Sequence, residues 1–138
     1  MITLLTGTKG SGKTKKLIAL IDEAFKASQG HVICVEQNES LRYDVKPSVR
    51  LVSADAYDIK GFDAFYGLLA GICASDHDVT DVLVDATLRI GSRDYEELAD
   101  FLAKVNKLSE VSDTKFTFTV STETSNIPER ALAFCELK

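Results

Sequence analysis

The chain has few of the residues that build metal sites and disulfide frameworks. It contains three cysteines, which lie far apart in the sequence, and two histidines. An odd number of widely spaced cysteines is not the pattern of a disulfide-stapled secreted domain, and no histidine or cysteine pair has the spacing of a zinc site. We therefore expect Cys34, Cys73 and Cys135 to be buried, reduced thiols in a cytoplasmic protein.

Excess positive charge and long apolar runs are also missing. Sixteen lysines and arginines against 21 acids give a net charge of −5, so the chain as a whole is not expected to bind nucleic acid or an anionic membrane. No apolar run has the length of a membrane span, and no signal peptide fits the N-terminal residues. The chain has 138 residues, 45% of them apolar, and lacks repeats and linkers, which predicts a single domain over 1–138.

What the sequence does contain is a glycine-rich loop near its beginning. Residues 7–14 match the pattern G-x-x-x-x-G-K-[ST], and a β-rich run at 2–6 precedes them while a helical pattern follows. Glycines let backbone N–H groups converge on phosphate oxygens, and the helix N-terminus adds the positive end of its dipole. The residues predicted to bind phosphate are Gly7, Thr8, Lys9, Gly10, Ser11, Gly12, Lys13 and Thr14.

Two side chains of this loop have separate predicted roles. The amine of Lys13 would reach the β- and γ-phosphates of a nucleotide, and the hydroxyl of Thr14 would bind Mg²⁺. The neighbouring Lys9, Lys15 and Lys16 add positive charge, and we interpret their side chains as ordinary solvated lysines.

Helices and strands alternate along the rest of the chain. Apolar residues at helical spacing predict helices over about 12–28 and 62–75, and a third helix from about Asp94. Residues 133–137 fit a strand or a terminal helix, and we favour the strand. The predicted strands cover 2–6, 31–36, 81–85, 115–121 and 133–137, with a short extra strand at 49–53. This order predicts an α/β three-layer sandwich with a mainly parallel central sheet.

On these features the chain resembles the P-loop nucleoside triphosphatases over nearly its whole length. Val82-Leu83-Val84-Asp85 is similar to their Walker B strand, whose acid holds Mg²⁺ through water. The later strand that ends at Ser121 and Thr122 resembles the one that RecA-like and AAA-type members insert between the phosphate-loop and Walker B strands. The resemblance implies the strand order 133–137, 2–6, 115–121, 81–85, 31–36.

The same resemblance implies further site residues. Asp85 would join Thr14 at the metal, and Ser121 and Thr122 would sense the γ-phosphate, although a plain polar turn explains these two residues equally well. Many members carry a catalytic glutamate directly after the Walker B acid, where this chain has Ala86.

The missing glutamate directs attention to other acids and to arginines. In RecA-like members the glutamate lies at the end of the second strand, so the resemblance makes Glu36 the candidate catalytic base, against the alternative of a solvated acid, and Glu123 a weaker candidate. Arginines after strand ends could act in trans in an oligomer or be surface charges. These arginines are Arg89, Arg93 and Arg130.

Three functions remain open at this point. The resemblance implies a protein that binds ATP and Mg²⁺ and is a slow or partner-activated ATPase, working with a protein partner or as a homo-oligomer. A small-molecule or nucleotide kinase is the first alternative, with the acidic stretch 53–61 holding an acceptor hydroxyl. A non-catalytic nucleotide switch or regulatory subunit is the second. A GTPase is disfavoured because the chain has no Asn-Lys-x-Asp motif.

Overall fold

The structure is a computed structural model that describes all residues from 1 to 138. Two short 3-10 turns accompany the helices, at Asp55–Tyr57 and Thr124–Asn126. The strands are β1 (Ile2–Thr6), β2 (His31–Glu36), β3 (Arg50–Ser53), β4 (Val79–Asp85), β5 (Lys115–Val120) and β6 (Cys135–Leu137). The helices are α1 (Lys13–Ala27), α2 (Phe62–Ser75), α3 (Thr87–Ile90), α4 (Tyr95–Ser112) and α5 (Glu129–Leu132).

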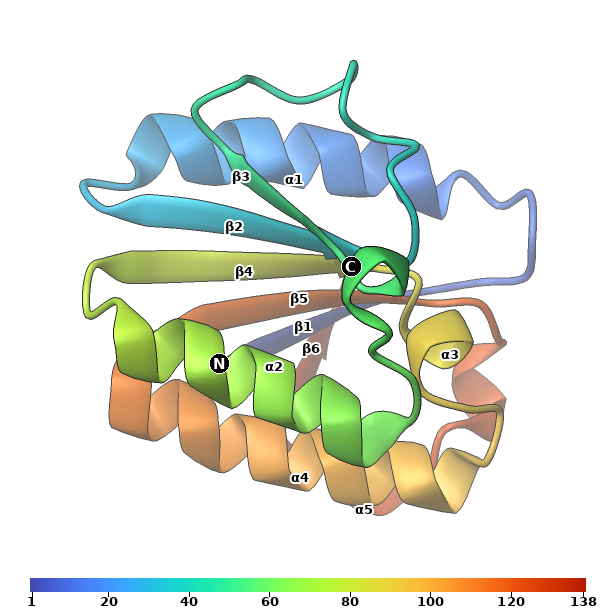
Figure 1. Cartoon of the computed structure of the whole chain (residues 1–138). Coiled ribbons are helices and arrows are strands. Elements are labelled where there is room, and N and C mark those ends of the chain that lie inside the picture. The colour runs from blue at the N-terminus through green and yellow to red at the C-terminus, as the bar shows by residue number, and fades with distance from the viewer.

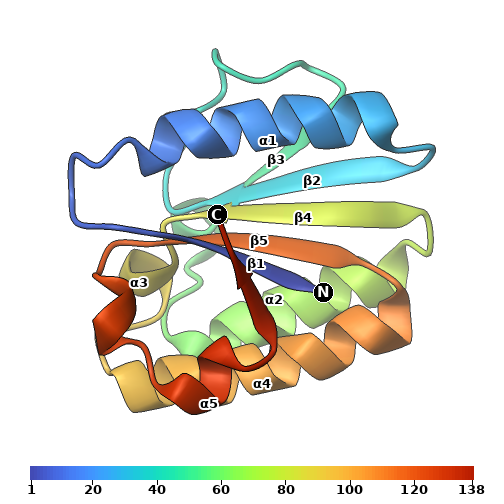
Figure 2. The same cartoon turned by 180° about the vertical axis from the view of Figure 1, so that it is seen from behind.

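All six strands form one parallel sheet in the order β3-β2-β4-β5-β1-β6. Helix α1 lies on one face of the sheet, and α2, α4 and α5 lie on the other (Figures 1 and 2). The predicted α/β sandwich is confirmed, and so is the order of its five main strands, with β5 between β1 and β4. The extra strand expected at 49–53 forms the edge strand β3.

Some boundaries differ from those expected. Strand β4 begins at Val79, two residues earlier than predicted. The sequence did not show this start because the polar Thr80 and Asp81 interrupt the apolar pattern of the strand. Strand β6 begins only at Cys135, since the last turn of α5 continues through hydrogen bonds from the Ala133 and Phe134 N–H groups. Helix α3 was not predicted, because four residues are too few to show a helical period.

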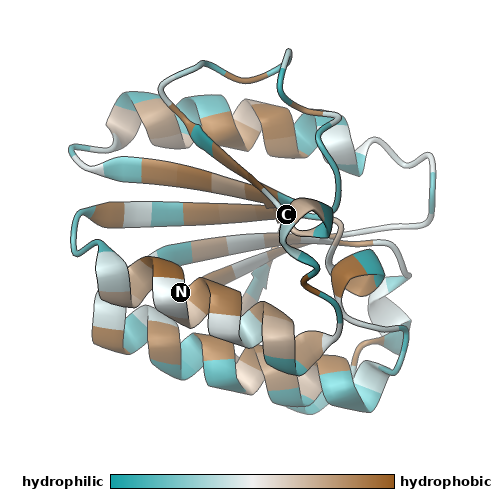
Figure 3. Ribbon diagram, in the orientation of Figure 1, coloured by the Kyte–Doolittle hydropathy of each residue, from teal (hydrophilic) through white to brown (hydrophobic).

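The core is unequal on the two faces of the sheet. Twenty-three buried residues cluster between the sheet and the α2–α4 layer, whereas eight lie under α1. Residues 32–35 of β2 and 82–84 of β4 are apolar on both sides of the sheet, as a central parallel strand requires. Figure 3 shows this apolar colouring along the middle strands. In the larger cluster the ring of Phe65 lies 4.8 Å from that of Phe101 and 6.3 Å from that of Phe118.

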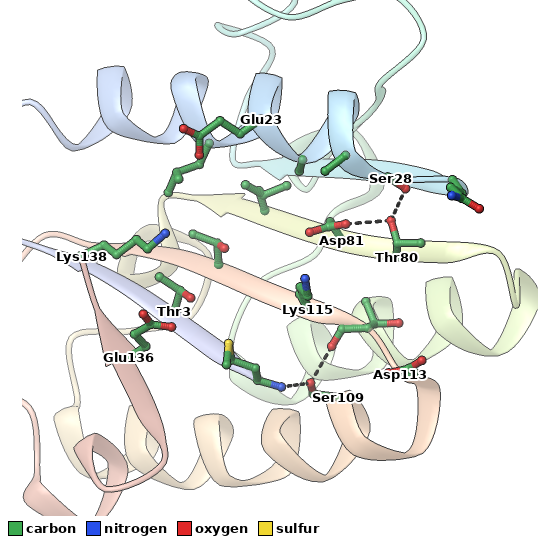
Figure 4. A pocket seen from close by; sticks show the side chains of 18 of the residues that line it. Thr3, Glu23, Ser28, Thr80, Asp81, Ser109, Asp113, Lys115, Glu136 and Lys138 are labelled. Atoms are coloured by element: carbon green, nitrogen blue, oxygen red, sulfur yellow. Dashed lines mark hydrogen bonds between the residues drawn. The ribbon is translucent and has the colours of Figure 1, made fainter.

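The α1 side of the sheet is polar beyond the reach of that helix. A groove of about 780 Å³ runs there between α1, the strands β4, β5, β1 and β6, and the end of α4 (Figure 4). Its walls include Thr3, Asp81, Lys115, Glu136 and Lys138. Polar side chains on these strands are consistent with a sheet face that is left in contact with water.

Replacing Phe65 with alanine should lower the free energy of unfolding by about 3–5 kcal/mol, because the fully buried ring leaves a cavity among neighbouring aromatic rings. Urea denaturation followed by circular dichroism measures this change. Val111→Ala is the control, since the side chain of Val111 is 87% exposed and its loss should change stability by less than about 0.5 kcal/mol. Equal effects of the two substitutions would contradict the assigned core.

Candidate functional site

The glycine-rich loop connects β1 to α1 at the carboxyl edge of the sheet. Gly7, Gly10 and Gly12 all have positive φ angles, of 141°, 87° and 86°, which L residues with a side chain rarely adopt. At Gly7 a Cβ atom would also lie 2.5 Å from the Ser11 hydroxyl oxygen. The glycines that the motif requires are therefore the residues on which the path of the loop depends.

The loop leaves a row of backbone donors free. The N–H groups of residues 12–15 form no hydrogen bond to another backbone group, as is usual for the first turn of a helix. At the start of the loop the N–H of Gly7 donates to the carbonyl of Thr122 at 2.9 Å, which ties the loop to the segment after β5. The free donors and the dipole of α1 together favour an anion at this position.

The side chain of Lys13 folds back over the loop. Its amine donates to the Thr8 carbonyl at 2.9 Å and to the Ser11 hydroxyl at 3.2 Å, and only 8% of the residue is exposed. Burial lowers the pKa of this ammonium, while the nearby Asp85 carboxylate acts in the opposite direction. A partly desolvated cation is thus fixed at the position where the sequence predicts the phosphates.

Asp85 and Thr14 come together as expected. The hydroxyl of Thr14 donates to one carboxylate oxygen of Asp85 at 3.3 Å, and the hydroxyl of Thr119 donates to the other at 2.6 Å. Thr119 is buried in β5 and was not singled out in the sequence. The implied strand order could have revealed it, because placing 115–121 beside 81–85 brings the end of one strand next to the acid that ends the other.

A cavity of about 480 Å³ opens above this cluster. Its charged lining consists of Lys9, Lys13, Lys15 and Arg89 against a single carboxylate, that of Asp85. The cavity collects four cations in a chain whose net charge is −5. Lys9 and Lys15 line the cavity and are exposed, which agrees with our interpretation of them as solvated lysines, and the exposed Lys16 does not line it. The remaining lining residues are Gly10, Gly12, Thr14, Ser40, Ala86 and Ser121.

Glu36 lies next to this cavity rather than in its wall. Its carboxylate accepts hydrogen bonds from the Ser40 hydroxyl and the Leu41 N–H, both at 3.2 Å, and the residue is 2% exposed. Burial raises the pKa of Glu36, and the bonds from Leu41 and Ser40 oppose that shift. Ser40 lines the cavity and donates to Glu36, so its hydroxyl connects the buried carboxylate to the cavity. No sequence pattern had indicated a role for Ser40.

The two residues expected to act as a γ-phosphate sensor have different positions. Ser121 lines the cavity. Thr122 is buried, and its hydroxyl is hydrogen-bonded to the Tyr95 hydroxyl at 2.9 Å and to the Asn126 side-chain amide at 3.0 Å. The exposed Glu123 is not part of the cavity wall.

The three arginines also separate. Arg89 lines the cavity. The guanidinium of Arg93 donates to the carbonyl of Ser121 at 3.4 Å, and that of Arg130 pairs with Glu96 and Asp100 on α4. Only one of the three is therefore directed to the candidate site of its own chain.

Neither the protein-family models nor the curated proteins with which the chain was compared match it. None of its helices is both long and apolar enough to cross a bilayer.

All three cysteines are free thiols; Cys34 and Cys73 are buried, and Cys135 is half-buried. Burial raises the pKa of Cys34 to about 12, so this thiol is protonated at neutral pH.

A second group of charged residues lies at the opposite edge of the sheet. His31 and Asp76 are paired at 2.6 Å between the imidazole Nδ1 and a carboxylate oxygen, and the Asp78 carboxylate lies close to both. The hydrogen bond and charge of Asp76 raise the pKa of His31. These side chains are exposed or half-buried, and an ion pair accounts for their arrangement.

Replacing Asp76 with asparagine should lower the pKa of His31 toward the ordinary histidine value of about 6.5, because the bonded carboxylate is lost. Titration of the imidazole by NMR measures the shift, and Asp113→Asn, on another loop, is the control. The pair contributes stability fully below the unfolded pKa and loses it as the pH rises through the folded one. An unchanged titration curve in Asp76→Asn would contradict the pairing.

Proposed function

We propose that the protein is a P-loop nucleoside triphosphatase that binds ATP with Mg²⁺ at residues 7–14 and hydrolyses it slowly. The observation that carries this proposal is the cavity at the loop, where four cations and free backbone N–H groups meet one carboxylate. A polyphosphate is the ligand class that matches this distribution of donors and charge.

The donor set beside the loop fits Mg²⁺. The hydroxyl oxygen of Thr14 and the carboxylate of Asp85 are hard oxygen ligands within hydrogen-bonding distance of each other, and Mg²⁺ prefers such ligands. Thr119 would hold the Asp85 carboxylate in orientation through its second oxygen. When bound, Mg²⁺ would neutralise charge on the β- and γ-phosphates.

The strand order supports the RecA-like and AAA-type branch of the superfamily. Strand β5 separates β1 from β4, and Ser121 at its end lines the cavity, which suits a γ-phosphate sensor. Thr122 would support the sensor and the loop through its contacts with Tyr95 and Gly7. Glu36 remains the candidate base. It would accept the proton of the attacking water either directly or through the hydroxyl of Ser40.

A non-catalytic nucleotide switch is the second candidate function. The composition of the cavity wall favours this function. Asp85, the proposed metal ligand, is the one carboxylate in the wall, so no second carboxylate lies there to activate a water molecule. The kinase alternative has less support, since none of the residues in 53–61 lines the cavity. Loop 37–49 would transmit the bound state to a partner in a switch, because Ser40 belongs to both the loop and the cavity.

Replacing Lys13 with alanine should weaken binding of Mg–ATP by about 100-fold or more, because charge-assisted hydrogen bonds to phosphate are lost at about 1.5–3 kcal/mol each. Isothermal titration calorimetry measures the affinity. Lys16→Ala is the matched control, since this exposed lysine on the same helix does not line the cavity. If Lys13→Ala, with an unchanged circular dichroism spectrum, kept the ATP affinity of the wild type, the phosphate-loop proposal would fail.

Replacing Glu36 with glutamine should preserve ATP binding and slow hydrolysis, because the amide keeps an oxygen that can accept from Leu41 but is not a base. Release of phosphate under single-turnover conditions measures the rate. Ser40→Ala separates the two ways in which Glu36 could act: a similar loss there indicates action through the hydroxyl, and an unchanged rate indicates direct contact. Wild-type hydrolysis by Glu36→Gln would exclude the residue as the base.

A further inference from the structure

We infer that the groove beside α1 docks a basic helix of a partner protein, whose lysines and arginines meet the carboxylates that line the groove. The groove lies on the face of the sheet that carries α1, toward the amino ends of the strands (Figure 4). It shares no residue with the cavity at the glycine-rich loop. The inference therefore goes beyond the proposed function and does not depend on nucleotide binding.

The layer that contains α1 is only partly filled. Helix α1 is alone on its side of the sheet, whereas α2, α4 and α5 lie on the other side (Figures 1 and 2). Parallel sheets normally have both faces covered. Beyond α1, side chains of β4, β5, β1 and β6 form the floor of the groove, whose volume is about 780 Å³. A second helix beside α1 would complete this layer.

The floor and the α1 wall of the groove suit a packed helix. The strand register places four side chains in one row across the floor, namely Leu83, Thr117, Thr3 and Glu136. On α1 the wall contains Leu20, Ala24 and Ala27, at the spacing i, i+4, i+7. A row at this spacing is a ridge against which another helix packs, and its alanines let that helix come close.

The charged side chains of the groove are free to meet a partner. Five carboxylates and two amines line it. No ion pair of the chain involves any of them, although Asp22 and Arg130 each form two such pairs elsewhere. The charged residues of the groove are Glu23, Asp81, Glu110, Asp113 and Glu136, with Lys115 and Lys138.

Helix ends add to the negative charge of the groove. Ser28 follows α1 and Asp113 follows α4, and both residues line the groove, so it receives the negative ends of two helix dipoles. The cavity at the glycine-rich loop has the opposite character, with four cations and one carboxylate. The two ends of the sheet therefore favour ligands of opposite charge, and the groove favours a cation.

The arrangement of these groups favours a protein helix over a metal ion or a small polyamine. The one group of carboxylates and histidine that converges closely enough for a metal is His31, Asp76 and Asp78, and none of these lines the groove. A polyamine would be repelled by Lys115 and Lys138. A helix can place an acid opposite those lysines, and its own lysine and arginine stems can cover the apolar wall while their charged ends reach the carboxylates.

The first experiment measures binding of a probe peptide by fluorescence anisotropy. The labelled peptide has 15 residues, the length of α1, with lysine and arginine set among alanine and leucine at helical spacing. The test variant, Glu23→Gln/Glu110→Gln/Glu136→Gln, removes three exposed carboxylates of the groove. It should bind the peptide about tenfold more weakly than the wild type, because three exposed charge pairs are lost.

A matched control changes the net charge equally outside the groove. Asp55→Asn/Glu123→Gln/Glu129→Gln also removes three exposed carboxylates, none of which lines the groove. Its affinity for the peptide should stay within about twofold of the wild type, because distant exposed charges are screened by salt. Equal losses in the two triple variants would show unspecific attraction to an acidic protein and overturn the inference.

Two further measurements test the position of the charges and the form of the partner. Lys115→Glu should strengthen binding of the same peptide by about threefold, a gain that misfolding does not produce. A peptide with proline at its centre should bind more weakly, because proline breaks the helix. Unchanged affinity in Lys115→Glu, equal binding of the proline peptide, or no saturable binding by the wild type up to about 1 mM would each contradict the basic helix.

Discussion

The parallel direction of all six strands is the constraint on which the candidate site depends. Each strand of a parallel sheet needs a crossover to return the chain to its starting edge, so all the carboxyl ends meet at one edge. The loop after β1, the acid that ends β4 and the serine that follows β5 come from distant parts of the sequence. They meet at this edge because the crossovers through α1, α2 and α4 leave them there.

Inside this arrangement the Asp85 carboxylate joins three elements. One oxygen accepts from Thr14 at the start of α1 and the other from Thr119 in β5, while Asp85 itself ends β4. The proposed metal ligand is thus connected to the proposed phosphate loop and to the strand that carries the proposed sensor. A change of charge at the Asp85 carboxylate would therefore alter its hydrogen bonds to Thr14 and to Thr119 together.

Much of the fold and the centre of the site could be predicted from the sequence. Apolar runs and helical spacing were enough for the strands and the long helices, and the position of β5 followed from the resemblance. The glycine-rich loop could be located because the pattern that defines it consists of residues that are consecutive in the chain. The proximity of Asp85 to Thr14 could be expected once the strand order was assumed.

The rest depended on side chains that no local pattern distinguishes. Arg89, Arg93 and Arg130 are alike in the sequence, and only packing shows that one faces the cavity while the others have partners. Glu36 looks like a free acid at a strand end, yet a loop that folds back over it buries its carboxylate against Ser40. Burial and long-range pairing of this kind are decided by tertiary structure, beyond the reach of a periodic pattern.

The two outermost strands of the sheet, β3 and β6, affect how this protein can associate with others. Edge strands β3 and β6 have only four and three residues, and β3 begins with the charged Arg50. Such short edges offer few unpaired backbone groups to a strand from another molecule, which protects the sheet from open-ended growth. Short edge strands therefore favour assembly through side-chain surfaces, where recognition depends on shape and charge and can be selective.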